Sequence, residues 1–267
     1  MFLLYDATFE GLLSALAFCL RGQRAVMGIF PEGRAQQCLM VPEPVASEPD
    51  ILARFDRYLS RRFGDGVLDL LFHAYLSETD DIEMRILGFL RTGLRIGTDP
   101  SGMLQDPDVA AVREAARTVS RQAHAYLGLL RFKRIAGVYV ADFEPDYHVL
   151  PLVAPHFADR MRDTPFLIRD RRRALASVGY PGKPWFIVAL DADDMTGADG
   201  SPSGLELPDS LAGEVMEETW RAYFSVMAIP ERIKPELQRS NMPKKYWKYL
   251  VERPGAGGSH GLRYNGR

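Results

Sequence analysis

Residues 106–141, DPDVAAVREAARTVSRQAHAYLGLLRFKRIAGVYVA, contain the change of pattern that decides the fold class of this chain. Asp106 followed by Pro107 is typical of a helix start, because a capping side chain precedes a residue whose fixed φ suits the first turn. Apolar residues then recur at helical spacing. From Phe132 they alternate around Gly137, a pattern that favours a strand or a hairpin. The stretch therefore predicts a long helix followed by sheet structure.

The residues before this stretch are predicted to be mainly helical. Phe2–Tyr5 is typical of a short strand, and Thr8 can cap the helix that follows it. Further helices are predicted from Ser47, Val67 and Ile82, where apolar residues recur at helical spacing. The first part of the chain, residues 1–104, is therefore expected to be helical with one short N-terminal strand.

The residues after the long helix predict short strands and turns. Phe166–Arg169 is typical of a strand, and Ala174–Tyr180 and Trp185–Leu190 flank a PGKP turn signal, which predicts a hairpin. The whole chain is thus expected to be α+β and predominantly helical, with a small antiparallel sheet and hairpin in its second half. The expected organisation is 1–104, an α+β part at 105–253 and a disordered tail at 254–267, although the first two are also compatible with one continuous domain.

Composition excludes several classes of site and location. Of the 267 residues 46 % are hydrophobic, which is ample for a packed core. The two cysteines, Cys19 and Cys38, cannot form a disulfide framework or a four-cysteine zinc site, and no metal or cofactor motif accompanies them. The apolar N-terminus lacks a positive leading segment and is too short to span a bilayer. A cytoplasmic protein without a metal, a cofactor or a membrane partner is expected.

The distribution of charge points to a polyanionic partner, although the net charge of the chain is only −2. Residues 1–112 have a net charge of −6 and residues 113–190 have +6. Residues 191–218 contain nine acidic and no basic side chains, and residues 219–267 have a net charge of +7. Two basic blocks separated by an acidic block indicate a polar electrostatic field if each block forms a patch in space.

The second basic block contains residues 231–253, ERIKPELQRSNMPKKYWKYLVER. Its lysines neutralise phosphates and its aromatic rings stack on bases if they face solvent, so it is a candidate nucleic-acid surface. The alternative is a helix that buries its aromatic residues and leaves its lysines in water. The candidate nucleic-acid contacts are Lys244, Lys245, Tyr246, Trp247 and Lys248.

Residues 142–173 form the densest polar cluster and offer two kinds of chemistry. Carboxylates with a histidine can act as general acids or bases, and adjacent arginines can hold phosphates through two hydrogen bonds. The alternative is that the carboxylates pair with the arginines and cap turns. If the strand at 174–180 extended backwards, Arg171 and Arg173 would share a face. The catalytic candidates are His156, Asp170 and Asp146, and the candidate phosphate contacts are Arg160, Arg171, Arg172 and Arg173.

Four strings together resemble a bacterial family assigned to DNA metabolism or DNA repair. They are YDATFEGLL at 5–13, EPDYHVLPLVAPHFADR at 144–160, FLIRDRRR at 166–173 and LQRSNMPKKYWKYL at 237–250. The family's module is a domain of unknown function. It occurs alone, encoded beside a radical-SAM protein of DNA repair, or fused behind a uracil-DNA-glycosylase-like domain. Ala7 stands where the family's first motif has glycine, so the turn there is expected to differ.

The resemblance and the basic residues together lead to three hypotheses. The first is a DNA-binding accessory protein of repair or base modification, which binds single-stranded or damaged DNA and acts with a radical-SAM or uracil-DNA-glycosylase-like partner. The second is an enzyme that acts on DNA or a nucleotide through the cluster at 142–173. The third is a protein-docking module without affinity for DNA. The sequence leaves open whether the chain is an enzyme.

Overall fold

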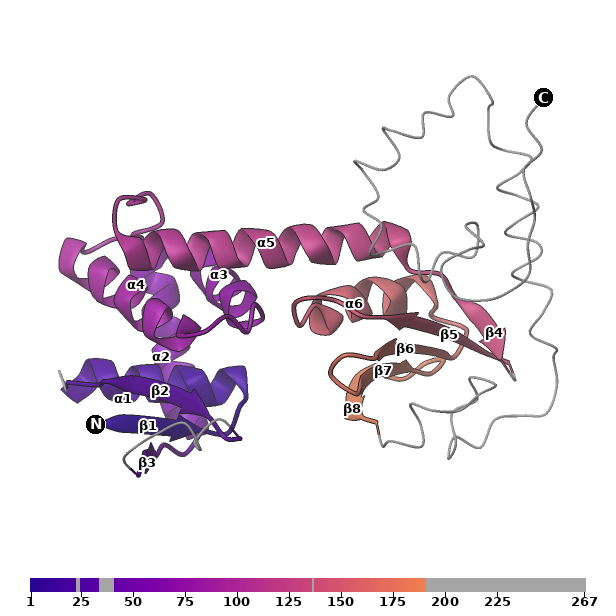
Figure 1. Cartoon of the computed structure of the whole chain (residues 1–267), viewed down its shortest axis with the longest axis horizontal. Helices are drawn as coiled ribbons and strands as arrows, with labels where there is room; N and C mark the ends of the chain where they lie inside the picture. Colours follow the sequence, from indigo (N-terminus) through magenta and orange to yellow (C-terminus); the bar gives the residue numbers. More distant parts are fainter. Residues whose placement is uncertain (23–24, 34–40, 136, 191–267) are drawn as a thin grey trace, which may run out of the picture. The chain divides into compact units, whose positions relative to one another are not determined.

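Two compact units make up the chain, Met1–Gln122 (unit 1) and Ala123–Arg267 (unit 2) (Figure 1). The division between them along the chain falls within the helix α5 (Pro107–Leu129). The residues that the computed structural model describes are 1–22, 25–33, 41–135 and 137–190. The predictions for 191–267, including the basic C-terminal segment and the disordered tail, lie outside the described residues.

Unit 1 contains a three-stranded parallel sheet in the order β2-β1-β3. Its strands are β1 (Phe2–Tyr5), β2 (Gly28–Pro31) and β3 (Glu43–Pro44). The helix α1 (Phe9–Gly22) connects β1 to β2, because neighbouring parallel strands require a crossover. The predicted first strand and the predicted cap are both confirmed, since Thr8 Oγ1 accepts a hydrogen bond of 2.9 Å from the amide of Gly11.

Helices pack with this sheet in one hydrophobic core. They are α1, α2 (Pro49–Phe63), α3 (Gly66–Tyr75), α4 (Ile82–Ile96) and the first turns of α5. The predicted start of α5 is confirmed, because Asp106 Oδ1 accepts hydrogen bonds from the amides of Asp108 at 3.0 Å and Val109 at 3.3 Å. The fully buried side chains of this core include Leu3, Leu12, Leu16, Leu59, Leu71, Leu87 and Leu90.

Unit 2 contains a five-stranded sheet in the order β4-β5-β6-β7-β8. The predicted hairpin around the PGKP turn is present as the antiparallel pair β7–β8, and the stretch predicted as a strand or a hairpin forms the antiparallel pair β4–β5. However, β5 and β6 run parallel, because α6 (Leu150–Arg160) carries the chain back before β6 begins. The sheet is thus mixed, where an antiparallel one was expected. Its strands are β4 (Lys133–Ile135), β5 (Val138–Phe143), β6 (Phe166–Asp170), β7 (Leu175–Gly179) and β8 (Phe186–Ala189).

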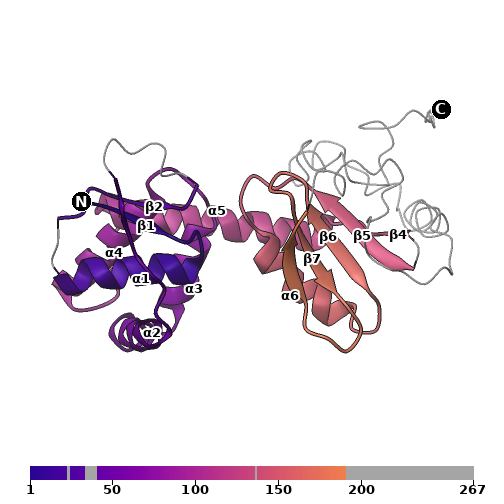
Figure 2. The ribbon, with the colours of Figure 1, turned by 90° about the horizontal axis from the view of Figure 1, so that it is seen from below.

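Helices bury the middle of this sheet. The helix α6 contacts β6 and β7 (Figure 2). Tyr126, in the last turns of α5, packs edge-on against Phe143 with ring centroids 4.9 Å apart. Every residue of β6 is buried, including Arg169 and Asp170, so the sheet must satisfy two charged side chains internally. The predicted α+β class, dominated by helices, is confirmed. Within the described ranges, no helix combines the length and the apolarity needed to cross a bilayer.

Candidate functional site

Arg169, which is buried, forms an ion pair with the half-buried Asp142 in unit 2. The two residues are partners in the parallel register of β5 and β6, which brings together side chains 27 positions apart. Arg169 donates from Nε to Asp142 Oδ1 at 2.6 Å and from its terminal nitrogen to Oδ2 at 2.9 Å. Because Arg169 is only 3 % exposed, this two-pronged contact neutralises a cation inside the sheet. The pair is therefore structural, and the parallel register that creates it was not predicted.

Asp170 and Arg173 form a second ion pair, which organises the turn between β6 and β7. Asp170 Oδ1 accepts hydrogen bonds from the backbone amides of Arg172 at 3.0 Å and Arg173 at 3.2 Å. The Arg173 guanidinium donates to Asp170 Oδ2 and to the carbonyl oxygens of Pro145 and Asp146, each at 3.1 Å. Burial raises the pKa of Asp170, and the charge of Arg173 opposes that effect. This turn clamps the loop between β5 and α6.

The other candidate arginines are more accessible. Residues 171–174 form a turn, so the strand does not extend backwards and the alternation considered for Arg171 and Arg173 does not apply. Arg171 is half-buried, with its terminal nitrogen 3.7 Å from Asp142. The Arg172 side chain is 59 % exposed and lies 3.8 Å from the Asp146 carboxylate. Arg160 is exposed at the end of α6. The outward-facing cations of this group are therefore Arg160 and Arg172.

The three catalytic candidates occupy different environments. Asp170 is fully buried, and its two carboxylate oxygens are engaged in the turn. Asp146 is exposed in the loop between β5 and α6. His156 is exposed on α6, and its ring packs edge-on against Phe157 with centroids 5.1 Å apart. The hydrogen bonds of Asp170 therefore serve the structure of the turn, whereas Asp146 and His156 face solvent.

The remaining predicted contacts lie outside the described residues. They are Lys244, Lys245, Tyr246, Trp247 and Lys248. Their assignment as nucleic-acid contacts stays a prediction from sequence. Among the described residues, no group of three or more His, Cys, Asp or Glu side chains is placed to hold a metal ion.

A pocket of about 340 Å³ in unit 2 was not predicted from the sequence. We call it the α6–hairpin pocket, because residues just after α6 and residues of the β7–β8 turn line it. The PGKP signal located the turn but gave no reason to place aromatic rings beside α6. The sequence feature from which the pocket could have been predicted is the pair of aromatic residues Tyr180 and Trp185, which lie on either side of Lys183. The lining includes Phe166, Tyr180, Trp185, Arg162, Asp163 and Lys183.

Glycines shape this pocket at two positions. Phe166 and Gly179 are cross-strand partners, and a Cβ atom added to Gly179 would lie within 2.0 Å of the Phe166 ring. Glycine at 179 therefore leaves the space that the ring occupies. Gly182 has φ of 67°, a left-handed conformation that glycine adopts at low cost, and it allows the amide of Lys183 to donate to the Tyr180 carbonyl at 3.2 Å.

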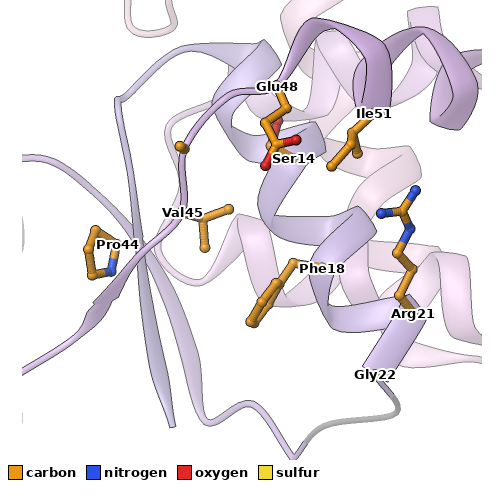
Figure 3. Close-up of a pocket in the computed structure, with 9 residues that line it drawn as sticks. Ser14, Phe18, Arg21, Gly22, Pro44, Val45, Glu48 and Ile51 are labelled. Atoms are coloured by element: carbon orange, nitrogen blue, oxygen red, sulfur yellow. The ribbon is translucent and has the colours of Figure 1, made fainter.

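Unit 1 has a pocket of about 360 Å³ between α1, the region of β3 and the start of α2 (Figure 3). Phe18 and Val45 give it an apolar wall, and Pro44 and Ile51 extend that wall. Its charged lining residues are Arg21 and Glu48, of opposite sign. The α6–hairpin pocket differs because two half-buried aromatic rings, Tyr180 and Trp185, line it together with two cations and one carboxylate.

Comparison with known proteins identifies a family and gives no biochemical function. Residues 80–252 match the family described as a domain of unknown function, DUF4130, over more than half of the 267-residue chain. No curated protein and no solved structure matches the chain. The matched range includes α4, α5 and the described part of unit 2 with the ion pairs and the α6–hairpin pocket. The chain therefore belongs to the DUF4130 family.

Proposed function

We propose that this chain is a DNA-binding accessory protein of bacterial DNA repair or base modification, which acts with a radical-SAM or uracil-DNA-glycosylase-like partner. The observation that carries the proposal is the surplus of positive charge in the described part of unit 2, residues 123–190. Residues 123–190 contain ten Lys or Arg and six Asp or Glu, a net charge of +4. Such a surplus attracts a polyanion and speeds its association.

The exposed cations are the ones available to phosphates. Arg169 and Arg173 are themselves largely buried and are paired with Asp142 and Asp170, so they are assigned to the fold and not to DNA. The basic segment at 231–253 adds lysines interleaved with aromatic residues. The proposed phosphate contacts in the described part of unit 2 are the exposed residues Lys133, Arg160, Arg162, Arg172 and Lys183.

The test is the salt dependence of binding to a fluorescent single-stranded oligonucleotide, measured by anisotropy. A variant with Lys244→Ala, Lys245→Ala and Lys248→Ala is expected to bind more weakly. Its slope of log affinity against log salt is expected to fall by about 0.7 for each phosphate contact removed. The matched control is R54A/R57A/R61A, which removes three exposed arginines from α2 in unit 1 and changes the net charge equally.

The control separates a specific basic surface from a general effect of net charge. Equal losses in the two triple variants would contradict the assignment of the C-terminal segment to the DNA surface. Absence of binding by the unmodified protein at low salt would contradict the DNA-binding function itself. Co-purification with a radical-SAM or glycosylase-like protein, together with absence of DNA binding, is the result expected of a protein-docking module.

A further inference from the structure

We infer that the α6–hairpin pocket holds one unstacked nucleobase of a DNA strand and favours a base with an exocyclic amino group. This inference rests on the proposed function and specifies the ligand of unit 2. A base that is single-stranded or damaged leaves the stack at low cost, so it is available to such a pocket. The inference rests on the size of the pocket, its aromatic lining and the charges at its edge.

The size and the aromatic lining suit a flat ring. The volume of about 340 Å³ lies at the lower end of the range typical of small-molecule pockets, roughly 300–1,000 Å³. Phe166 is buried beneath the pocket, whereas Tyr180 and Trp185 are half-buried and keep accessible ring surface. A half-buried aromatic side chain offers a ring face on which any of the bases can stack.

The charged lining suits the rest of a nucleotide. Lys183 is exposed on the turn between β7 and β8, where an ammonium group can meet a backbone phosphate. Arg162, which is paired with Asp159, adds a second positive group on the α6 side. The Asp163 carboxylate is also exposed and accepts hydrogen bonds only, so it favours the amino group of cytosine over the carbonyl of thymine.

The hairpin holds these groups in a defined geometry before any ligand arrives. The hydrogen bond between the Lys183 amide and the Tyr180 carbonyl closes the turn, and β7 pairs with β8 immediately beyond it. The Phe166 ring packs over Gly179, and this contact fixes the position of the ring at the floor of the pocket. A ligand therefore binds without ordering this turn, which reduces the entropic cost of association.

The test compares two neighbouring aromatic residues of one hairpin. Trp185 lines the pocket, whereas Phe186 is 47 % exposed and is not among the lining residues. Binding of a single-stranded oligodeoxycytidylate is measured for the unmodified protein, Trp185→Ala, Trp185→Phe and Phe186→Ala. The expected loss of affinity for W185A is about 5- to 150-fold, because one stacking contact is removed. W185F and F186A are expected to remain within about threefold.

The outcomes separate the pocket from the proposed function. If the unmodified protein binds DNA while W185A and F186A lose equal affinity or none, the pocket assignment is wrong and DNA binding stands. If W185A does not fold, as judged by its thermal transition, K183Q decides, since it is expected to lower the salt slope by about 0.7. An unchanged slope then overturns the assignment.

Two further comparisons test the ligand. Deoxycytidine monophosphate is expected to bind at least tenfold more weakly than the oligonucleotide, whose additional phosphates contact the exposed cations. Equal affinities would assign the pocket to a free nucleotide and contradict a strand. The unmodified protein is expected to prefer oligodeoxycytidylate to oligodeoxythymidylate, and Asp163→Asn is expected to reduce that preference. Equal binding of the two oligonucleotides by the unmodified protein would contradict the amino-group preference.

Discussion

Ala7 has φ of 58°, a left-handed backbone conformation that non-glycine residues rarely adopt. The surrounding contacts hold it there. The amide of Thr8 donates to Asp6 Oδ1 at 3.0 Å, and the Tyr75 hydroxyl donates to the Ala7 carbonyl at 2.6 Å. The sequence led us to expect that alanine would alter this turn. The structure shows a left-handed conformation at Ala7, in which alanine is strained, and a difference from the glycine-containing motif stays a prediction.

The strain at Ala7 predicts that Ala7→Gly stabilises the protein. The substitution removes the Cβ atom from a left-handed position, so the free energy of unfolding is expected to rise by about 1 kcal/mol. The matched control is Ala53→Gly at an exposed position of α2, which is expected to lower it by about 1 kcal/mol. Denaturant titration measures both. A lower free energy of unfolding for A7G would show that Ala7 is not strained.

At the scale of elements, the turn between β6 and β7 joins parts of the chain that are distant in sequence. The Arg173 side chain donates hydrogen bonds to the carbonyl oxygens of Pro145 and Asp146. The Asp170 side chain accepts hydrogen bonds from two backbone amides of the turn itself. Asp170 is fully buried and the Arg173 side chain is 11 % exposed, so neither charge can be left unpaired without a large cost.

Asp170→Ala is therefore expected to lower the free energy of unfolding by about 3 kcal/mol. Asp170→Asn is expected to cost less, because an amide oxygen still accepts the backbone hydrogen bonds of the turn. The matched control is Asp159→Ala, since Asp159 and Arg162 have the same spacing but are exposed. Its expected cost is much smaller, because both partners of an exposed pair stay solvated when the pair is broken. Similar losses in the free energy of unfolding for D170A and D159A, measured by denaturant titration, would contradict the role of the β6–β7 turn as a clamp.

The elements with local signals could be predicted from the sequence. The Asp106–Pro107 cap located the start of α5, and the PGKP signal located the β7–β8 hairpin. The parallel pairing of β5 with β6 has no local signal, because it depends on where α6 returns the chain. For the same reason, the sequence could group the arginines of the site but could not show that Arg169 meets a carboxylate 27 positions away.

At the scale of the whole molecule, family and folding unit do not coincide. The family match begins at residue 80, within unit 1. The core of that unit includes Leu3 and Leu12 from before the match and Leu87 from within it. The described residues of the match therefore depend on the first strand and helix of the chain for part of their packing.

The charges of unit 1 and of the described part of unit 2 differ in sign. Residues 1–122 contain 13 Lys or Arg and 17 Asp or Glu, a net charge of −4, whereas residues 123–190 have +4. From net charge alone, the proposed polyanion is expected to associate with the described part of unit 2 in preference to unit 1. The α6–hairpin pocket and the exposed arginines lie in the attractive part.

The most direct test of this account is photocrosslinking of the full chain to a single-stranded oligonucleotide that contains 5-iododeoxycytidine, followed by peptide mapping. Halogenated bases couple to the aromatic rings they touch, so the position of each adduct reports a contact. The account predicts adducts at Tyr180 or Trp185 and in the segment 244–249. Adducts confined to residues 1–122, or no adduct at low salt, would contradict it.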